Sequence, residues 1–297
     1  MSNRIIRDVD FDYVIVDEAA KATFPELAVS LNKAHKIILV GDHQQLPPVL
    51  DTEIIRNNRE KLDEESLAQG IFEKMYNMFP DDNKHRLTIQ YRMHPTIGTL
   101  ISHVFYNDEI QNGVEAQDRE LCIEGYEDTA IEWISTSKYS SKERYEKEFD
   151  NNGKKSYQNY LERNIIEKKL LELDSKLTQK TKVAVITGYG PQKYILQTMV
   201  KQHSYKNLEI DVDTVDAFQG SQKDIILYST VRSSANKYGI GFLKSEARIN
   251  VAFSRARCLL IIVGDMNFLD NYRIRGNKFP EIIEYIKESE GCRIIEE

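Results

Sequence analysis

Cysteines and long apolar runs are both scarce in this sequence. Its three cysteines, Cys122, Cys258 and Cys292, lie far apart and form no pair with the spacing of a metal site. Three cysteines cannot all be bridged within one chain, which favours a reducing compartment, and we expect the cytoplasm. No stretch approaches the roughly 20 apolar residues of a membrane-spanning helix, and the first residues hold no apolar core of signal-peptide length. We therefore expect neither a disulfide-stapled secreted domain nor a membrane partner.

An excess of basic residues is also missing. Forty lysines and arginines stand against 47 aspartates and glutamates, which gives a formal net charge of −7. This balance disfavours a protein that coats nucleic acid with its whole surface, whereas a local basic groove remains compatible with it. Apolar residues make up 41% and charged residues 29% of the 297 residues. Such a composition is typical of a folded chain with one large domain or two of ordinary size.

A phosphate-binding loop of the form Gly-x-x-x-x-Gly-Lys-Ser/Thr is absent from the sequence. The nearest stretch, residues 153–156, lacks both the first glycine and the required spacing. Gly188 and Gly190 resemble the start of a dinucleotide-binding loop, but the third glycine of that loop is missing. We therefore give the second pattern little weight.

Two carboxylates directly follow an apolar run near the start of the chain. The run, FDYVIV at 11–16, predicts a buried strand and stops at Asp17 and Glu18. Ligands of open parallel α/β sheets bind beyond the carboxyl ends of the strands. An aspartate there can hold Mg²⁺, and an adjacent glutamate can orient and deprotonate a water molecule. The alternative is a solvated acidic turn, and these residues alone do not decide between the two.

The next segments complete a strand–helix–strand unit. A helix over 24–31, capped by Thr23, precedes a second predicted buried strand over 36–40. The loop after this strand places Gln45 on the same sheet edge as the two carboxylates. Its amide can bond a terminal phosphate or an attacking water, although the loop also fits a proline-bounded polar turn. A helix is expected over 66–78, and turn residues at 80–83 set a domain boundary after residue 83.

The remainder of the chain alternates between strand and helix patterns, which predicts an α/β fold. Strands are expected near 86–90, 131–135, 183–187, 210–215, 225–231 and 259–265, and helices from Pro95 and over 157–173, 245–256 and 280–288. Residues 137–156 are nearly all polar and are interpreted as a mobile surface excursion. The tail after residue 288 gives no signal. Arg248 and Arg255 would share an exposed face of the 245–256 helix, where neither fills a core.

Five stretches occur in an order that resembles superfamily-one helicases, in the branch of the nonsense-mediated-decay RNA helicase and senataxin. They are VDEA at 16–19, VGDHQQLPP at 40–48, QYRMHP at 90–95, VDAFQG at 215–220 and RINVAFSRAR at 248–257. Five collinear stretches are far more specific than any one of them. The resemblance implies RecA-like parallel sheets flanked by helices, the P-loop NTPase fold, with ATP bound between two such domains.

The resemblance also implies roles for particular residues. Asp17 would support Mg²⁺, Glu18 would be the catalytic base, and Gln45 would sense the γ-phosphate. Arg92 and Arg255 would reach in from the second domain as arginine fingers, since a guanidinium stays charged and matches phosphate oxygens. The residues implied for the nucleotide pocket are Tyr91, Tyr189, Gln192, Gly220 and Gln222.

Two of these pocket assignments leave alternatives open. Many relatives have glutamate where this chain has Gln222, which makes its ribose contact less specific. Tyr91 fits core packing as well as it fits the nucleotide pocket.

In this family the lysine loop precedes the acidic strand, yet only ten residues precede Phe11. The resemblance therefore implies the carboxy-terminal part of an ATP-dependent DNA or RNA helicase or translocase. Residues 1–83 would be the back part of a first RecA-like domain with an uncovered sheet edge or face, and residues 84–297 a complete second domain. The expected partners are single-stranded DNA or RNA and the missing amino-terminal portion, or a protein that supplies it.

The function of this chain by itself is left open at this point. The retained acids, glutamine and arginines favour descent from an active enzyme, whereas the missing lysine loop argues against ATP hydrolysis by this chain alone. The competing interpretation is a non-catalytic nucleic-acid-binding or scaffold module.

Overall fold

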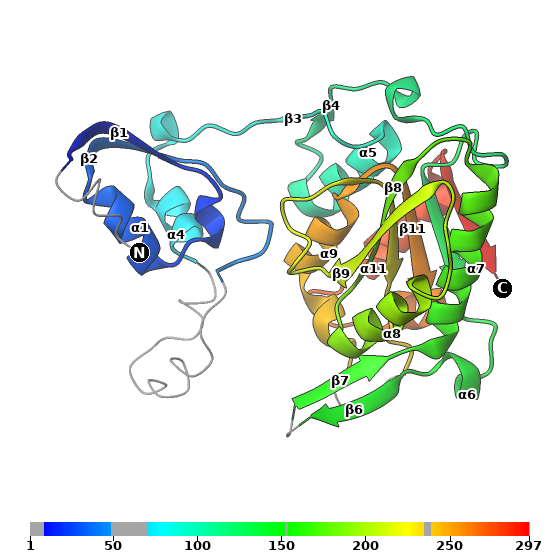
Figure 1. Ribbon diagram of the computed structural model, residues 1–297. Helices are drawn as coiled ribbons and strands as arrows, with labels where there is room; N and C mark the ends of the chain where they lie inside the picture. Colours follow the sequence, from blue (N-terminus) through cyan, green and yellow to red (C-terminus); the bar gives the residue numbers. More distant parts are fainter. Residues whose placement is uncertain (1–8, 49–69, 152–153, 235–238, 297) are drawn as a thin grey trace. The chain divides into compact units, whose positions relative to one another are not determined.

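The computed structural model describes residues 9–48, 70–151, 154–234 and 239–296 (Figure 1). The chain divides into two compact units, Met1–Arg86 and Leu87–Glu297. The predicted boundary after residue 83 and this division both lie between the short helix η3 (Asp81–Asn83) and strand β3 (Ile89–Gln90). Across the described ranges, no helix has the length and apolar character needed to cross a membrane.

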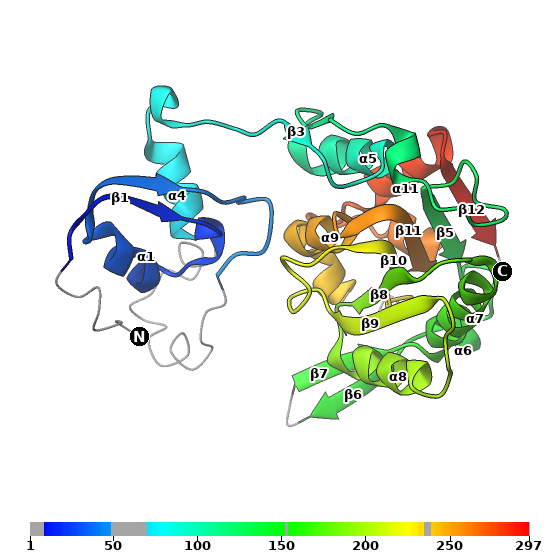
Figure 2. The ribbon, with the colours of Figure 1, turned by 45° about the horizontal axis from the view of Figure 1, so that its top comes forward.

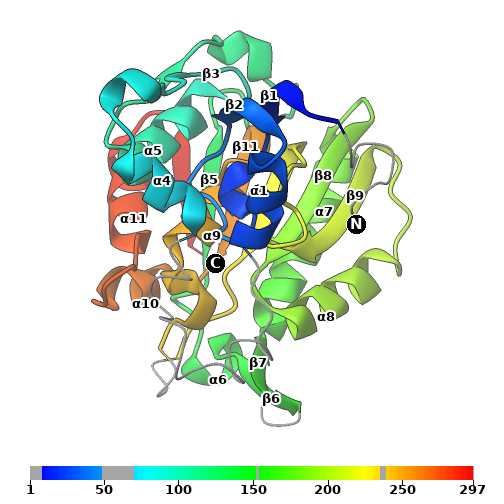
Figure 3. The ribbon, with the colours of Figure 1, turned by 90° about the vertical axis from the view of Figure 1, so that its left-hand side faces the viewer.

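The first unit is built around two parallel strands (Figure 3). Strand β1 (Phe11–Val16) pairs with β2 (Ala34–Leu39), and α1 (Phe24–Leu31) connects them. A capping box fixes the start of α1, because Thr23 and Glu26 bond each other at its first turn. Helix α4 (Ile71–Met78) covers the predicted helix of residues 66–78 from residue 71 on; residues 66–69 lie outside the described residues.

The strands of the first unit are more exposed than predicted. Tyr13 is 55% exposed, Ile15 66% and Ile38 47%, so the prediction of buried strands is wrong for the described residues. The small core of this unit contains Val16, Leu27 and Leu39, among others, from one side of the sheet only. No other part of the described unit covers the opposite side, which agrees with the expectation of an uncovered face.

The second unit contains a six-stranded parallel sheet in the order β12-β5-β11-β10-β8-β9. Its strands are β5 (Ile131–Ser135), β8 (Thr181–Thr187), β9 (Leu208–Thr214), β10 (Lys223–Ser229), β11 (Ala256–Gly264) and β12 (Cys292–Glu296). The central strands are continuous apolar runs because helices cover both of their faces. The α/β fold with a parallel sheet predicted from the sequence is therefore confirmed.

Helices cover the two faces of this sheet in distinct groups (Figure 2). On one face α7 (Tyr160–Lys176) and α8 (Gly190–Val200) pack against β8, β10 and β11 to form the main apolar core. The other face carries α5 (Pro95–Tyr106), α9 (Glu246–Phe253) and α11 (Phe279–Glu288), with α10 (Met266–Asn271) beside α11. Edge-to-face contacts such as Tyr228 with Phe253 join the sheet to this second layer.

Two local predictions in this unit are corrected by the structure. The predicted 157–173 helix begins at Tyr160, because Tyr157 belongs to β7 (Lys154–Gln158). The predicted 245–256 helix ends at Phe253. The tail, which carried no sequence signal, forms the edge strand β12 beside β5.

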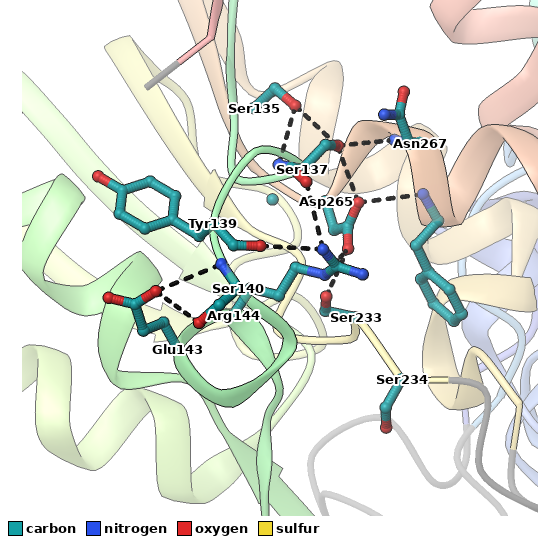
Figure 4. A network of polar contacts seen from close by, with 12 residues as sticks. Ser135, Ser137, Tyr139, Ser140, Glu143, Arg144, Ser233, Ser234, Asp265 and Asn267 are labelled. Carbon is teal, nitrogen blue, oxygen red and sulfur yellow. Dashed lines mark hydrogen bonds and ion pairs between the residues drawn. The ribbon is translucent and has the colours of Figure 1, made fainter.

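The described residues of the polar segment 137–156 form regular elements at the surface of the second unit. It contains α6 (Ser141–Arg144) and strand β6 (Lys147–Asn151), which pairs with β7 in an antiparallel hairpin. Asp265, 1% exposed at the end of β11, anchors the segment (Figure 4). Its carboxylate pairs with Nε of Arg144 at 2.9 Å and accepts a bond from Ser137 Oγ at 2.8 Å. Most of the described side chains of this segment are exposed, as expected of a surface excursion, and the buried carboxylate that anchors it belongs to Asp265.

A second buried charge lies in the sheet itself. Glu132 on β5 has no exposed surface and pairs with Nζ of Lys169 on α7 at 3.2 Å. Nε of Arg293 on β12 donates to the same carboxylate at 2.6 Å, and the Tyr126 hydroxyl donates at 3.0 Å. The charge is therefore paired and fully bonded, as a buried charge has to be.

Candidate active site

The two predicted acids occupy the turn that follows β1. Both Asp17 and Glu18 are exposed, and the Asp17 carboxylate accepts a bond from the Glu18 amide at 2.9 Å. Glu18 has φ 53° and ψ 33°, a left-handed conformation that is uncommon for a residue with a side chain. Such backbone conformations occur often in functional turns. The turn therefore presents two carboxylates at the carboxyl end of the strand.

The loop after β2 is fastened to this turn. Ala19 N donates to Val40 O, and Val40 N to Val16 O, each at 2.8 Å. Gly41 lies so close that an added Cβ would be 2.7 Å from the Ala20 nitrogen, so a side chain there would clash with main chain. The sequence thus needs glycine at this position to bring the two strand ends together.

Gln45 is held within this loop. Its Nε2 donates to Asp42 Oδ2 at 2.8 Å, and its main-chain nitrogen bonds Asp42 O at 3.2 Å. Because β1 and β2 are parallel, the glutamine loop and the acidic turn lie at the same edge of the sheet, as the strand–helix–strand pattern predicts.

A magnesium ion fits the donors at this edge. Mg²⁺ is usually held by one or two carboxylates together with waters and substrate phosphates. The exposed Asp17 carboxylate offers one such ligand. Within the described ranges, no cluster of three or more His, Cys, Asp or Glu side chains forms a complete protein cage for a metal.

In the second unit, the Arg92 turn connects β3 to α5. The side-chain oxygen of Gln90 accepts bonds from the amides of Arg92 and Met93, each at 2.8 Å. Helix α5 begins at Pro95, and proline is well suited to the first turn of a helix. Tyr91 is 62% exposed, so the alternative of core packing for this residue is wrong.

Arg255 lies in the turn between α9 and β11, only 2% exposed. Its Nε donates to Val251 O at 3.0 Å, at the carboxyl end of α9 where carbonyls lack helical partners. The prediction that Arg255 sits on an exposed helix face is therefore wrong, because the helix stops before it. Arg248 is still on the helix and pairs with Asp216 at 3.0 Å.

The two candidate fingers meet at one residue. Arg92 Nη1 donates to Ser254 O at 3.2 Å, and Arg255 Nη2 donates to Ser254 Oγ at 3.1 Å. Close by, the amide of Lys223 donates to Arg255 O at 3.1 Å. This last bond places Gln222, which is exposed, beside Arg255. The structure thus gathers these residues at the amino ends of β10 and β11.

Gly220 belongs to the same loop and is exposed. It has φ 83°, and an added Cβ would meet no atom within 4 Å. Glycine is needed there for its backbone conformation and not for space.

Tyr189 and Gln192 lie at the opposite end of the strands, beyond their carboxyl ends. Tyr189 follows β8, whose last residue Thr187 pairs in register with Ser229. Ser229 is six residues beyond Lys223 along β10. At ~3.3 Å per residue, the two ends of this strand are therefore roughly 20 Å apart. The structure does not bring Tyr189 and Gln192 together with the arginines.

Both residues at this end are also buried. Tyr189 packs edge-to-face against Tyr157 and Phe242, and burial raises its pKa to about 12. Gln192 has no exposed surface and donates to Asn159 O and Ser229 Oγ. Both side chains therefore hold the fold in this conformation.

Comparison with known proteins identifies two AAA domain families in the chain. One matches residues 67–267 and the other residues 1–53. Regulator of nonsense transcripts 1 from Caenorhabditis elegans is 33% identical, over 93% of this chain and 25% of its own length. ATP-dependent helicase upf1 from Schizosaccharomyces pombe is 34% identical, over 92% of this chain and 28% of its own.

Two further matches extend these relationships. An uncharacterized ATP-dependent helicase from Methanocaldococcus jannaschii is 30% identical, over 97% of this chain and 40% of its own length. Among solved structures, the PRRSV helicase matches 84% of this chain and 34% of its own at 18% identity, with a TM-score of 0.40, too low to support any further inference. The chain spans about a quarter to two fifths of the length of these curated relatives. It belongs to the AAA domain family, within the superfamily-one helicases that include the regulators of nonsense transcripts.

Proposed function

We propose that this chain is the carboxy-terminal part of an ATP-dependent helicase or translocase that moves on a single strand of DNA or RNA. The observation that carries this proposal is the convergence of Arg92 and Arg255 on Ser254. Two arginines joined at the edge of one sheet, beside an exposed glycine-containing loop, fit a site that senses a phosphate delivered by another domain.

In this proposal the first unit contributes the hydrolytic groups. The exposed Glu18 carboxylate would accept a proton from the attacking water, and Gln45, already oriented by Asp42, would orient that water or the terminal phosphate. Asp17 would hold Mg²⁺, which when bound neutralises phosphate charge.

The second unit would contribute the positive charge. Arg92 is half-buried, with its guanidinium already placed by a main-chain oxygen. Arg255 is deeper, so its contact with a phosphate would require the bonds to Val251 and Ser254 to be exchanged. Removal of an arginine finger typically lowers turnover by ~10³–10⁵.

The proposal includes the domain arrangement and the partners. Residues 1–83 would be the back part of one RecA-like domain and residues 84–297 the second. A polypeptide segment with the lysine loop would complete the first domain, and the open apolar side of β1 and β2 offers it a surface. The three free cysteines fit a cytoplasmic setting.

A joined protein tests this function. The full chain would be fused behind the amino-terminal portion of one of its relatives, which by family resemblance carries the lysine loop. ATP turnover would be measured with and without single-stranded DNA or RNA. We expect turnover stimulated by one of these strands and reduced at least a hundredfold by Glu18→Gln or by Arg92→Ala.

The matched control is Arg163→Ala. Arg163 is a partly exposed arginine of α7 that pairs with Glu167 at 2.6 Å, far along the chain from the proposed site. Its replacement should leave turnover unchanged. Strand binding without turnover in the joined protein would instead favour the non-catalytic binding or scaffold module.

A further inference from the structure

We infer that Arg119 is a positioning residue for Arg92: it holds the turn from which the candidate finger projects. Arg119 ends the short helix η4 (Ala116–Arg119), 27 residues after Arg92 in the chain. This inference rests on the proposed function, because a finger needs positioning only if it meets a phosphate. The geometry of the turn can be tested independently of that function.

The guanidinium of Arg119 spans two successive carbonyl groups of the turn. Its Nε donates to Arg92 O at 2.8 Å and its Nη2 donates to Tyr91 O at 2.7 Å. A third bond, from Nη1 to Asp118 O at 2.7 Å, ties the same group to its own helix. Because the guanidinium is planar and its donors form a rigid fork, two such bonds fix both the position and the orientation of the peptide units.

The amides of the same turn are satisfied from the other side. The Gln90 side chain accepts from Arg92 N and Met93 N, and its Nε2 donates to Asn112 Oδ1 at 2.7 Å. Gln90 therefore shapes the turn locally. Arg119 acts from a distant segment and fixes the shaped turn against the rest of the unit.

The segment that carries Arg119 is itself fastened beside the turn. Strand β4 (Gln111–Asn112) pairs in parallel with β3, and Gly113 N donates to Gln90 O at 2.9 Å. The Tyr91 ring lies so close to Gly113 that an added Cβ would be 2.4 Å from its Cε1. Such close packing leaves little freedom between the two segments, so Arg119 has a firm base from which to hold Arg92.

The consequence concerns the direction of the Arg92 side chain. With its main-chain oxygen held by Arg119 and its amide by Gln90, the backbone of Arg92 is restrained on both sides, whereas its side-chain bonds remain free to rotate. This restraint keeps the start of the side chain at the position from which Nη1 reaches Ser254 O. Loss of the fork should leave the second unit folded and release the turn.

The test uses the full chain and three variants: Arg119→Ala, Arg119→Lys and the control Arg163→Ala. Hydrogen exchange is followed at the amides of Arg92 and Met93 and at amides of the central strands, and the side-chain Nε–H resonance of Arg92 is followed by NMR. In Arg119→Ala we expect the two turn amides to exchange about tenfold faster while the strand amides stay within about twofold. The Arg92 resonance should shift or broaden, and Arg119→Lys should restore part of both effects. Arg163→Ala should change neither.

Other outcomes would overturn the inference. Unchanged turn amides and an unchanged Arg92 resonance in Arg119→Ala would show that the fork does not hold the turn. An equal acceleration across all amides would show that Arg119 only stabilises the unit as a whole. If Arg119→Ala does not fold, Arg119→Lys is compared with the wild type, since a single ammonium cannot reproduce the planar fork. Faster exchange confined to the turn amides would then support the inference, and unchanged exchange there would overturn it.

Turnover of the joined protein separates this inference from the proposed function. If Arg119 positions the finger, Arg119→Ala should lower kcat at least tenfold with KM within about twofold. If Arg92→Ala leaves turnover intact, the finger role fails, while the exchange data still report whether Arg119 holds the turn.

Discussion

The guanidinium of Arg92 donates to the main-chain oxygen of Ser254 across 162 residues of sequence. The Ser254 hydroxyl accepts from Arg255, so one serine supports both arginines at the edge of the sheet. A second link, from His94 N to Arg257 O at 2.7 Å, fastens the Arg92 turn to the start of β11. Any motion of the second unit should therefore carry both arginines together.

This arrangement predicts that Arg255 contributes to stability. Its buried guanidinium bonds Val251 O and Ser254 Oγ, so Arg255→Ala removes two buried hydrogen bonds from the unit. We expect a loss of about 1–3 kcal/mol in the free energy of unfolding, measured by denaturant titration. Arg163→Ala, which breaks a partly exposed ion pair, should cost only ~0–1 kcal/mol. Equal, small losses in the two variants would show that Arg255 is not needed for the fold.

A second prediction concerns the isolated chain, which should hydrolyse ATP poorly or not at all. Without the lysine loop, the β- and γ-phosphates lack their usual cradle of backbone amides and the lysine ammonium. Steady-state phosphate release from the purified chain is the measurement. Turnover near the ordinary enzyme median of ~10 per second, abolished by Glu18→Gln, would contradict this prediction.

Limited proteolysis should distinguish the two units. The second has a large core covered on both sides of its sheet, whereas β1 and β2 expose apolar side chains such as Ile15. We expect a stable fragment that begins between Lys84 and Leu87, identified by mass spectrometry after trypsin treatment. Uniform resistance of the whole chain, in a sample shown to be monomeric, would argue against a difference in stability between the units.

The pH dependence of stability should report Glu162. Burial raises the pKa of this carboxyl to about 8, although hydrogen bonds from Ser229, Val231 and Thr230 act in the opposite direction. A carboxyl with a raised folded-state pKa binds more protons in the folded state than in the unfolded one. Its contribution to stability is therefore complete below about 4.5 and is lost as the pH rises toward about 8.

Over that window the free energy of unfolding should fall by at most about 1.4 kcal/mol per pH unit from this group. Denaturant titrations between pH 5 and 8 on the wild-type chain and on Glu162→Gln measure the difference. The variant should show a flatter profile, and the exposed Glu124→Gln serves as control. Identical slopes in Glu162→Gln and the wild type would show that this carboxyl does not set the profile.

Most of the second unit could be predicted from the sequence because its signals are local. Apolar runs bounded by turns located β8, β10 and β11, and Pro95 located the start of α5. The edge strand β12 and the polar hairpin could not be predicted in this way. Their structure depends on distant partners, such as Asp265 for Arg144, which no periodic pattern in the sequence indicates.

In the candidate site, too, the residues placed by local signals could be predicted, whereas those placed by distant contacts could not. Asp17, Glu18 and Gln45 follow strand ends, so their placement at one sheet edge follows from the parallel pairing of β1 and β2. The burial of Arg255 depends on where α9 ends, and helix ends are poorly marked in sequence. Ser254 and Arg119 were missed because both act through main-chain or hydroxyl bonds that carry no pattern.

The buried pairing of Glu132 with Arg293 has a consequence for the edge of the sheet. Side chains alternate between the faces of a strand, so a one-residue slip of β12 would carry Arg293 to the opposite face. Glu132 would then keep Lys169 but lose its second cation inside the protein. Here a single buried charge pair opposes a one-residue slip of the final strand.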